Sequence, residues 1–262
     1  MTSKTEPRLL CYDLGEGVTA FSTTRHGGVS EANYASFNIN PYCGDSADHV
    51  ARNRQLLADR LGLPASHIVL PHQVHGIEHR AVAPELLDMS DVVRDKILDG
   101  VDMVTTSMTG VCIGVSTADC IPVLLYDPVA RATAAIHAGW RGTLQRICQR
   151  AVMAMQLHYG TTPDRLRAVV GPGISLANFE VGQEVYDQFV QAGFDLTETA
   201  EWHTKWHLDL PGINIRELIG CGVAPEHIHH AGICTFDHAD DYFSARRLGI
   251  DSGRIYTGIL MR

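Results

Sequence analysis

The sequence predicts an α+β protein built around a mixed β-sheet. Short β-like runs follow one another along the chain, some joined by tight turns, and only a few helical segments interrupt them. A doubly wound fold would need a regular alternation of strand and helix, which is absent. The 262 residues suffice for a full core, arranged as one large domain or two small ones.

The first third of the chain predicts two strands and one helix. Val18–Thr24 is rich in β-formers and is followed by a turn containing two glycines. A helix capped by Asp45 or Ser46 runs to Leu61, because apolar residues recur on one face before a glycine and a proline. Ile68–Val74 then has the composition of a strand.

The middle third is dense in β-like segments. We expect strands at Val101–Thr106, Val111–Thr117, Pro122–Tyr126 and Ala132–His137. The turn at Asp127-Pro128 predicts a hairpin between the last two.

The last part of the chain predicts helices between strands. After Gly142, apolar residues from Leu144 to Met155 follow helical spacing. Further on we expect a strand at Leu166–Val170, helices near Val181–Ala192 and Ile213–Cys221, and a final strand at Arg254–Met261.

Composition excludes several classes of protein. With 45% hydrophobic and 19% charged residues, the chain is typical of a globular protein. Its net charge of −9 disfavours a nucleic-acid binder, which needs a basic surface. No apolar stretch approaches the ~18 residues of a membrane span, and the N-terminus predicts no signal peptide. The seven cysteines lack a disulfide rhythm, so we expect a cytoplasmic protein.

Three separated segments carry the strongest functional signal. They contain His75, Cys120 and His137, each beside small or glycine residues that allow close approach of a ligand. Two imidazoles and a thiol are a plausible zinc-binding set, and three protein ligands leave a fourth position open for water or substrate. An open position is typical of a catalytic metal, so the pattern favours a metalloenzyme.

Each of these residues also has a structural interpretation. His75 could be a core or surface histidine, Cys120 a buried thiol, and His137 part of a helix start. Were the metal structural, a fourth ligand would have to come from a residue such as His72 or Cys112. Residues three apart on a strand point to opposite faces, so His72 and His75 cannot easily bind one metal. We favour His75 because Gly76 follows it and ends the strand.

Polar residues near these segments are candidates for binding and acid–base chemistry. Arg141 stands between glycines at a predicted helix start, where backbone N–H groups and a guanidinium together can bind an anion. Arg25 lies in similar glycine-rich surroundings. Asp119, next to Cys120, is a candidate acid or base, although it could instead orient a ligand.

A histidine cluster near the C-terminus, formed by His227, His229 and His230, is interpreted as a solvated or edge-strand feature. One His-x-His pair is far short of the ligands of a multinuclear copper centre. The His-x-Glu and Pro-Cys-x-x-Cys motifs of zinc deaminases and the His-Glu-x-x-His motif of zinc proteases are absent.

Taken together, the motifs resemble the family once named multicopper polyphenol oxidase or laccase domain and now usually described as purine nucleoside phosphorylase/adenosine deaminase. The resemblance rests on Ser22–Ser30, Gly44-Asp45, Asn53-Arg54, Gln73–Gly76, Thr117–Pro122, His137–Gly142, Val170–Ile174, Phe179–Gly182 and Phe243–Arg247. The chain departs from the family pattern at Ala245, where an aromatic residue is common.

The resemblance implies a zinc site, with copper as an alternative metal, made by His75, Cys120 and His137. It implies one domain over residues 1–262, a mixed β-sandwich flanked by helices. The implied activities are phosphorolysis of adenosine, inosine, guanosine and methylthioadenosine and deamination of adenosine. Alternatives reported for the family are copper-dependent phenol oxidation and a peptidoglycan-editing amidase acting on a serine-containing UDP-muramoyl precursor.

From the resemblance and the residues together we assign roles. Cys120 and Asp119 are the expected catalytic residues, and Arg25 and Arg141 the expected substrate- and phosphate-binding residues. The expected partners are a purine nucleoside and phosphate, with no nucleic acid and no membrane. We expect a monomer or a weak homo-oligomer.

Overall fold

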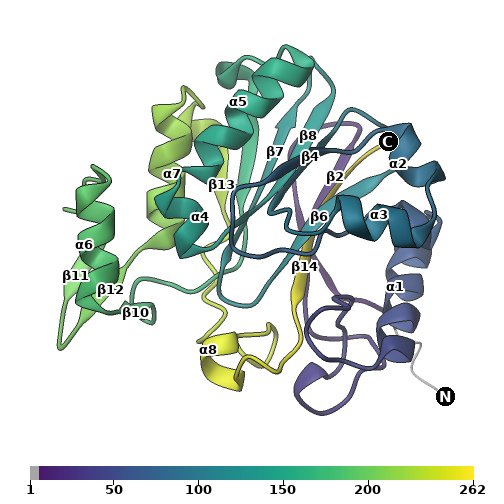
Figure 1. Cartoon of the computed structure of the whole chain (residues 1–262), viewed down its shortest axis with the longest axis horizontal. Coiled ribbons are helices and arrows are strands. Elements are labelled where there is room, and N and C mark those ends of the chain that lie inside the picture. The colour runs from purple at the N-terminus through teal and green to yellow at the C-terminus, as the bar shows by residue number, and fades with distance from the viewer. Residues whose placement is uncertain (1–5) are drawn as a thin grey trace.

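Two mixed β-sheets stacked face to face form the centre of the protein, and helices cover their outer faces (Figure 1). The computed structural model describes residues 6–262. In order, the five-stranded sheet contains β1 (Leu9–Tyr12), β2 (Val18–Thr23), β14 (Ile255–Met261), β6 (Cys112–Thr117) and β3 (Ile68–Val69). The six-stranded sheet contains β13 (Ile228–His230), β9 (Arg167–Val170), β7 (Ile121–Asp127), β8 (Ala132–Ala138), β5 (Met103–Thr106) and β4 (His79–Ala81).

Both sheets are mainly antiparallel, with parallel pairs at their edges. β3 pairs in parallel with β6, β13 with β9, and β4 with β5. The hairpin β7–β8 pairs seven residues on each strand, from Ile121↔Ala138 to Asp127↔Ala132. This register brings the start of β7 beside the end of β8.

Helices and one small sheet complete the fold. The α-helices are α1 (Ala47–Leu61), α2 (Pro84–Asp88), α3 (Asp91–Ile97), α4 (Trp140–Leu144), α5 (Ile147–Tyr159), α6 (Gln183–Gln191), α7 (Leu210–Gly220) and α8 (Ala245–Leu248). A three-stranded sheet, in the order β10 (Glu180–Val181), β12 (Trp206–Leu208) and β11 (Ala200–Trp202), lies beside α6 at one side of the body (Figure 1). No helix in residues 6–262 combines the length and apolar character needed to cross a membrane.

Alternation along the central strands explains the layers. On β7, Val123 and Leu125 join the core beneath α5 and α7, whereas Leu124 and Tyr126 join the core between the two sheets. Successive strand residues point to opposite faces, and both faces of this strand are buried, so β7 is apolar almost throughout. The other sheet behaves alike, with Phe21 facing α1.

The structure confirms the predicted α+β class, the mixed sheets and the sandwich flanked by helices. The prediction of a single domain over residues 1–262 includes residues 1–5, which lie outside the described part of the chain. The predicted helix that starts near Asp45 and Ser46 is α1, with Ser46 at its N-cap and left-handed Gly62 at its C-cap.

Two predicted elements were wrong in extent. The strand expected over Ile68–Val74 ends at Val69, because Pro71 offers no N–H for pairing and the chain leaves the sheet there. The helix expected from Leu144 to Met155 is broken at Arg146, whose φ of 60° places it in the left-handed region. The three-stranded sheet and the short α2, α3 and α8 were not predicted.

Candidate metal centre

Three of the predicted residues meet at one end of the sandwich. Cys120 immediately precedes β7, and His137 is the penultimate residue of β8, so the pairing of Ile121 with Ala138 brings them together. His75 comes from the long loop between β3 and β4. The sequence motifs therefore converge because strand ends and loops meet at this rim of the two sheets.

The donor atoms of His75, Cys120 and His137 all lie within 4.8 Å of one another. The two imidazole rings meet edge to face, with centroids 4.8 Å apart. Gly139 keeps the space beside them open: a Cβ there would lie 3.0 Å from Cδ2 of His75 and 3.1 Å from Sγ of Cys120. A side chain at position 139 would therefore press on two of the three donors.

A buried carboxylate, Asp102, organises both histidines. Its Oδ1 accepts a 2.6 Å hydrogen bond from Nδ1 of His137 and a 3.0 Å bond from the backbone N–H of His75. Its Oδ2 accepts bonds from the N–H groups of Val74, at 3.2 Å, and Gly76, at 2.7 Å. A carboxylate behind a metal-binding histidine fixes the ring and directs its other nitrogen outward. The sequence analysis missed Asp102.

These contacts also hold a strained backbone. His75 has a φ of 62°, in the left-handed region, and the three consecutive N–H groups bound by Asp102 fix the chain there. Gln73 ties the same loop to β6: its Nε2 donates to the carbonyl of Ser116 and its Oε1 accepts from the N–H of Ser116, each at 2.8 Å. The loop that carries His75 is thus fixed from two sides.

Charge distribution at the site favours a thiolate. Burial opposes ionisation of Cys120, but the neighbouring His137 and His75 outweigh it and lower the pKa of the thiol to about 6. Burial disfavours the charged form of His137, yet Cys120 and Asp102 raise the pKa of its ring to about 9. Thiolate is the form that binds metals and acts as a nucleophile.

The donor set fits a metal ion. Zinc binds nitrogen and sulfur at about 2.0–2.3 Å, so ligands of a tetrahedral ion lie roughly 3.3–3.8 Å apart. Donors within 4.8 Å of one another need a contraction on the order of 1 Å at most to share one ion. The set of two imidazoles, one thiol and a carboxylate behind one imidazole is compatible with a metal centre.

A cavity of about 290 Å³ opens beside the three donors. On its wall the ring of Tyr42 stacks on that of His72, with centroids 4.2 Å apart, and Nδ1 of His72 contacts Oδ1 of Asp99 at 2.6 Å. His72 thus lines the cavity but lies outside the donor cluster. Among the described residues, Arg254 is the only lysine or arginine in the lining.

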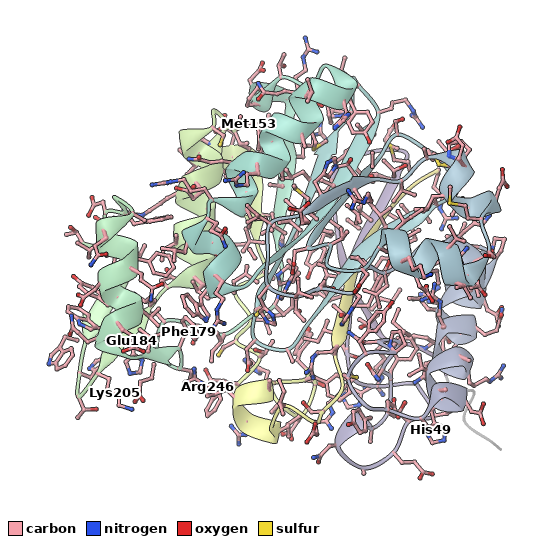
Figure 2. The ribbon with its side chains drawn as sticks, in the orientation of Figure 1. His49, Met153, Phe179, Glu184, Lys205 and Arg246 are labelled. Carbon is pink, nitrogen blue, oxygen red and sulfur yellow. The ribbon has the colours of Figure 1, made fainter. Side chains whose placement is uncertain are left out.

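Asp119, the candidate acid or base, is buried and fully engaged. Its Oδ1 accepts a 2.7 Å bond from Oγ1 of Thr235, and its Oδ2 accepts a 2.6 Å bond from the N–H of Arg246. Cζ of Arg246 in turn lies 5.6 Å from the ring centroid of Phe179, and Figure 2 labels both side chains. Asp119 therefore connects the loop that carries Cys120 to α8. Its acid–base role stays a prediction.

The two predicted anion-binding arginines lie outside the cavity lining. Arg25 donates from Nε to the carbonyl of Ala35 at 2.9 Å and from a terminal nitrogen to the carbonyl of Ala239 at 2.7 Å. Arg141 is exposed and stacks on Trp140, with Cζ 4.3 Å from the ring centroid. Their roles in binding phosphate stay predictions. Arg254, which does line the cavity, carried no motif of its own.

The C-terminal histidine cluster lies at a sheet edge. His229 and His230 belong to β13, which pairs only with β9 in the described chain, and His227 ends the short helix before it. The interpretation as an edge-strand feature is confirmed.

Comparison with known proteins identifies the family. A family model described as multi-copper polyphenol oxidoreductase laccase matches residues 19–262. This chain belongs to that laccase-domain family. It is 44% identical over 247 residues to a purine nucleoside phosphorylase of Bacteroides thetaiotaomicron, covering 93% of this chain and 92% of the relative. It is 40% identical to adenosine deaminase RL5 from an unknown prokaryotic organism, covering 93% and 94%.

Solved structures of the laccase-domain family show the same fold. Protein YfiH of Bacillus licheniformis superposes with a TM-score of 0.90 at 28% identity, over 98% of this chain and 97% of that one. YlmD of Geobacillus stearothermophilus gives a TM-score of 0.87 at 30% identity, over 96% and 94%. The family description names several coppers, whereas residues 6–262 form a single three-donor cluster.

Proposed function

We propose that this laccase-domain protein is a zinc-dependent purine nucleoside phosphorylase that also deaminates adenosine. The observation that carries the proposal is the convergence of His75, Cys120 and His137 at the wall of a cavity large enough for a small ligand. The names of its relatives, purine nucleoside phosphorylase and adenosine deaminase, support the same chemistry. The cytoplasm, where nucleosides and phosphate are available, is the proposed location.

We propose His75, Cys120 and His137 as the zinc ligands, held for that role by Asp102. Zinc held by these three residues would supply Lewis-acid chemistry and a water of lowered pKa. Asp102 accepts a hydrogen bond from Nδ1 of His137, which leaves Nε2 of the same ring for the metal. Asp119 keeps the segment containing Cys120 against α8, and we retain it as the candidate acid or base.

The cavity wall offers surfaces suited to a nucleoside. The stacked pair of Tyr42 and His72 presents flat rings against which a purine can pack. Phosphate needs a cation, and three arginines are candidates: the predicted Arg25 and Arg141, and Arg254, which lines the cavity. Phosphorolysis requires that phosphate be held beneath the sugar and that the departing base be stabilised.

A panel of nucleosides tests the proposal. Zinc-loaded protein is incubated with adenosine, inosine, guanosine or methylthioadenosine, each with and without inorganic phosphate. Base release that depends on phosphate and ammonia release from adenosine that does not are the expected results. Cys120→Ala should abolish both. Absence of both reactions in zinc-loaded wild-type protein would overturn the proposal.

A further inference from the structure

A second cavity, of about 420 Å³, shares Tyr42 as a lining residue with the cavity at the metal centre. Residues of α1, β3 and α3 line it, and α1 and α3 lie next to each other in Figure 1. One wall is apolar and is formed by Ile68, Val69, Leu70 and Leu98. The lining also includes charged side chains from α1 and α3. None of its charged side chains lines the cavity at the metal centre.

The distinctive group in this cavity is Arg54 of α1. Its side chain is mostly buried, and burial lowers the pKa of its guanidinium. One terminal nitrogen of Arg54 donates a hydrogen bond to the backbone carbonyl of Ile68. No carboxylate forms an ion pair with Arg54 within residues 6–262. Because a largely buried guanidinium without an anion is costly, Arg54 has unused capacity for an anionic ligand.

The other charges at the cavity leave Arg54 as the available cation. Arg94 already pairs with Asp91 on the same helix. Asp95 of α3 also lines the cavity, and its charge favours the charged form of Arg54, but its side chain is exposed and it forms no ion pair with Arg54 within residues 6–262. Tyr42 contributes a phenol at the wall shared with the metal cavity. A mostly buried cation beside an apolar wall interacts with an anion more strongly than an exposed one does.

We propose that this cavity binds a phosphate group, carried by free inorganic phosphate or by a phosphomonoester, through the guanidinium of Arg54. The guanidinium of Arg54 has five N–H donors, and only one of its nitrogens, Nη2, bonds the carbonyl of Ile68, so further N–H groups can bind phosphate oxygens. Arg94 also lines the cavity, where Asp91 balances its charge. The site is separate from the zinc centre and goes beyond the proposed activity.

Titration of the full-length, metal-free protein with inorganic phosphate tests the site. Two-dimensional NMR of the arginine Nε–H groups and calorimetry report binding, with potassium chloride at matched ionic strength as the reference. The Nε–H signal of Arg54 should shift with phosphate and not with chloride. A second arm titrates ribose 5-phosphate, with ribose as its control. Comparing the affinity for ribose 5-phosphate with that for inorganic phosphate shows whether the site prefers a phosphomonoester or the free ion.

Matched variants give the decisive comparison. Arg54→Gln keeps a donor for the carbonyl of Ile68 and should weaken phosphate binding by about tenfold or more. Arg52→Gln removes the same charge from an exposed position on the same helix and should leave affinity within about twofold. Cys120→Ala should bind phosphate as well as wild type, so failure of the nucleoside chemistry leaves this result intact.

Two results would overturn the proposal. One is an Arg54 signal that responds equally to chloride and phosphate in wild-type protein. The other is equal affinity for phosphate in Arg54→Gln and Arg52→Gln. If Arg54→Gln does not fold, the NMR titration of wild-type protein decides alone.

Discussion

Replacing Asp102 by asparagine should show how much the carboxylate behind the proposed metal ligands contributes, because the three ligand side chains themselves stay unchanged. The carboxylate accepts four hydrogen bonds, two on each oxygen, from His137 and the N–H groups of Val74, His75 and Gly76. Asparagine keeps the shape but replaces one carboxylate oxygen with an NH₂ group, which donates hydrogen bonds and does not accept them. Depending on the orientation of the amide, this NH₂ group faces the N–H groups of Val74 and Gly76, or the N–H of His75 and the ring of His137. At least one pair of buried donors is then left without an acceptor.

The magnitude follows from that loss. Removing one partner of a buried charge pair costs about 3–5 kcal/mol, and each donor left unsatisfied about 1–3 kcal/mol, with partial relief as the loop relaxes. We therefore expect Asp102→Asn to destabilise the metal-free protein by roughly 3–5 kcal/mol. Zinc affinity should fall about 10- to 100-fold, as for other residues that orient a ligand.

A second His–Asp pair in the same chain provides the control. Nδ1 of His72 lies 2.6 Å from Oδ1 of Asp99, the same distance as between His137 and Asp102. The exposed fractions differ, at 40% and 65% for the His72–Asp99 side chains against 4% and 0% for His137–Asp102. Exposed pairs contribute about 0–1 kcal/mol, so Asp99→Asn should change stability little and zinc affinity not at all.

Urea unfolding of metal-free protein and competition for zinc with a chelator measure the two effects. Burial raises the pKa of Asp102, but the His137 and backbone hydrogen bonds outweigh it and lower the pKa overall. Its stabilisation is then complete above the unfolded-state value of about 3.9 and is lost as pH falls through the lower folded-state pKa. The difference in the free energy of unfolding between wild type and Asp102→Asn should therefore become smaller in acid. Equal zinc affinities for Asp102→Asn and Asp99→Asn would refute the reasoning.

Three further predictions concern the same site. Gly139→Ala should weaken zinc binding in a chelator competition while leaving urea unfolding of metal-free protein nearly unchanged, because the new Cβ would press on His75 and Cys120 and the φ of −69° suits alanine; a loss of stability matching the loss of affinity would contradict this. Zinc-loaded protein should oxidise phenols weakly or not at all, since zinc has no accessible redox change and residues 6–262 form one three-donor cluster; oxygen consumption without added copper would overturn it. Losing a phosphate contact should cost about 1.5–3 kcal/mol, which is tenfold or more in rate. Arg141→Ala should therefore slow phosphate-dependent release of base from inosine more than it slows deamination of adenosine, and Arg254→Gln is assayed in the same way. If Arg141→Ala slows both reactions equally, the role of Arg141 is structural.

The sequence predicted which side chains meet at the candidate site better than the residues that hold them in place. His75, Cys120 and His137 could be selected because each side chain is of a metal-binding type and stands beside small residues at a strand end. Asp102 gives a weaker signal, a single carboxylate within the apolar run from Val101 to Thr106. A charge in such a run must have buried partners, but sequence alone does not say which.

The errors in the fold have local causes. The strand predicted at Ile68–Val74 overlooked Pro71, which ends pairing. The break at Arg146 has no sequence signal, because a left-handed arginine is set by its tertiary contacts with Glu217 and the carbonyl of Ala192. Short elements such as β10 and β13, of two and three residues, depend on pairing with distant segments rather than on their own composition.

The central claim is that His75, Cys120 and His137 bind one zinc ion that the reaction requires. Elemental analysis of purified wild-type protein and of alanine variants at these three positions, with His72→Ala as the control, tests it most directly. We predict about one zinc per chain in wild type and His72→Ala, and loss of zinc in the other three together with loss of nucleoside turnover. Full zinc occupancy in Cys120→Ala would contradict the account.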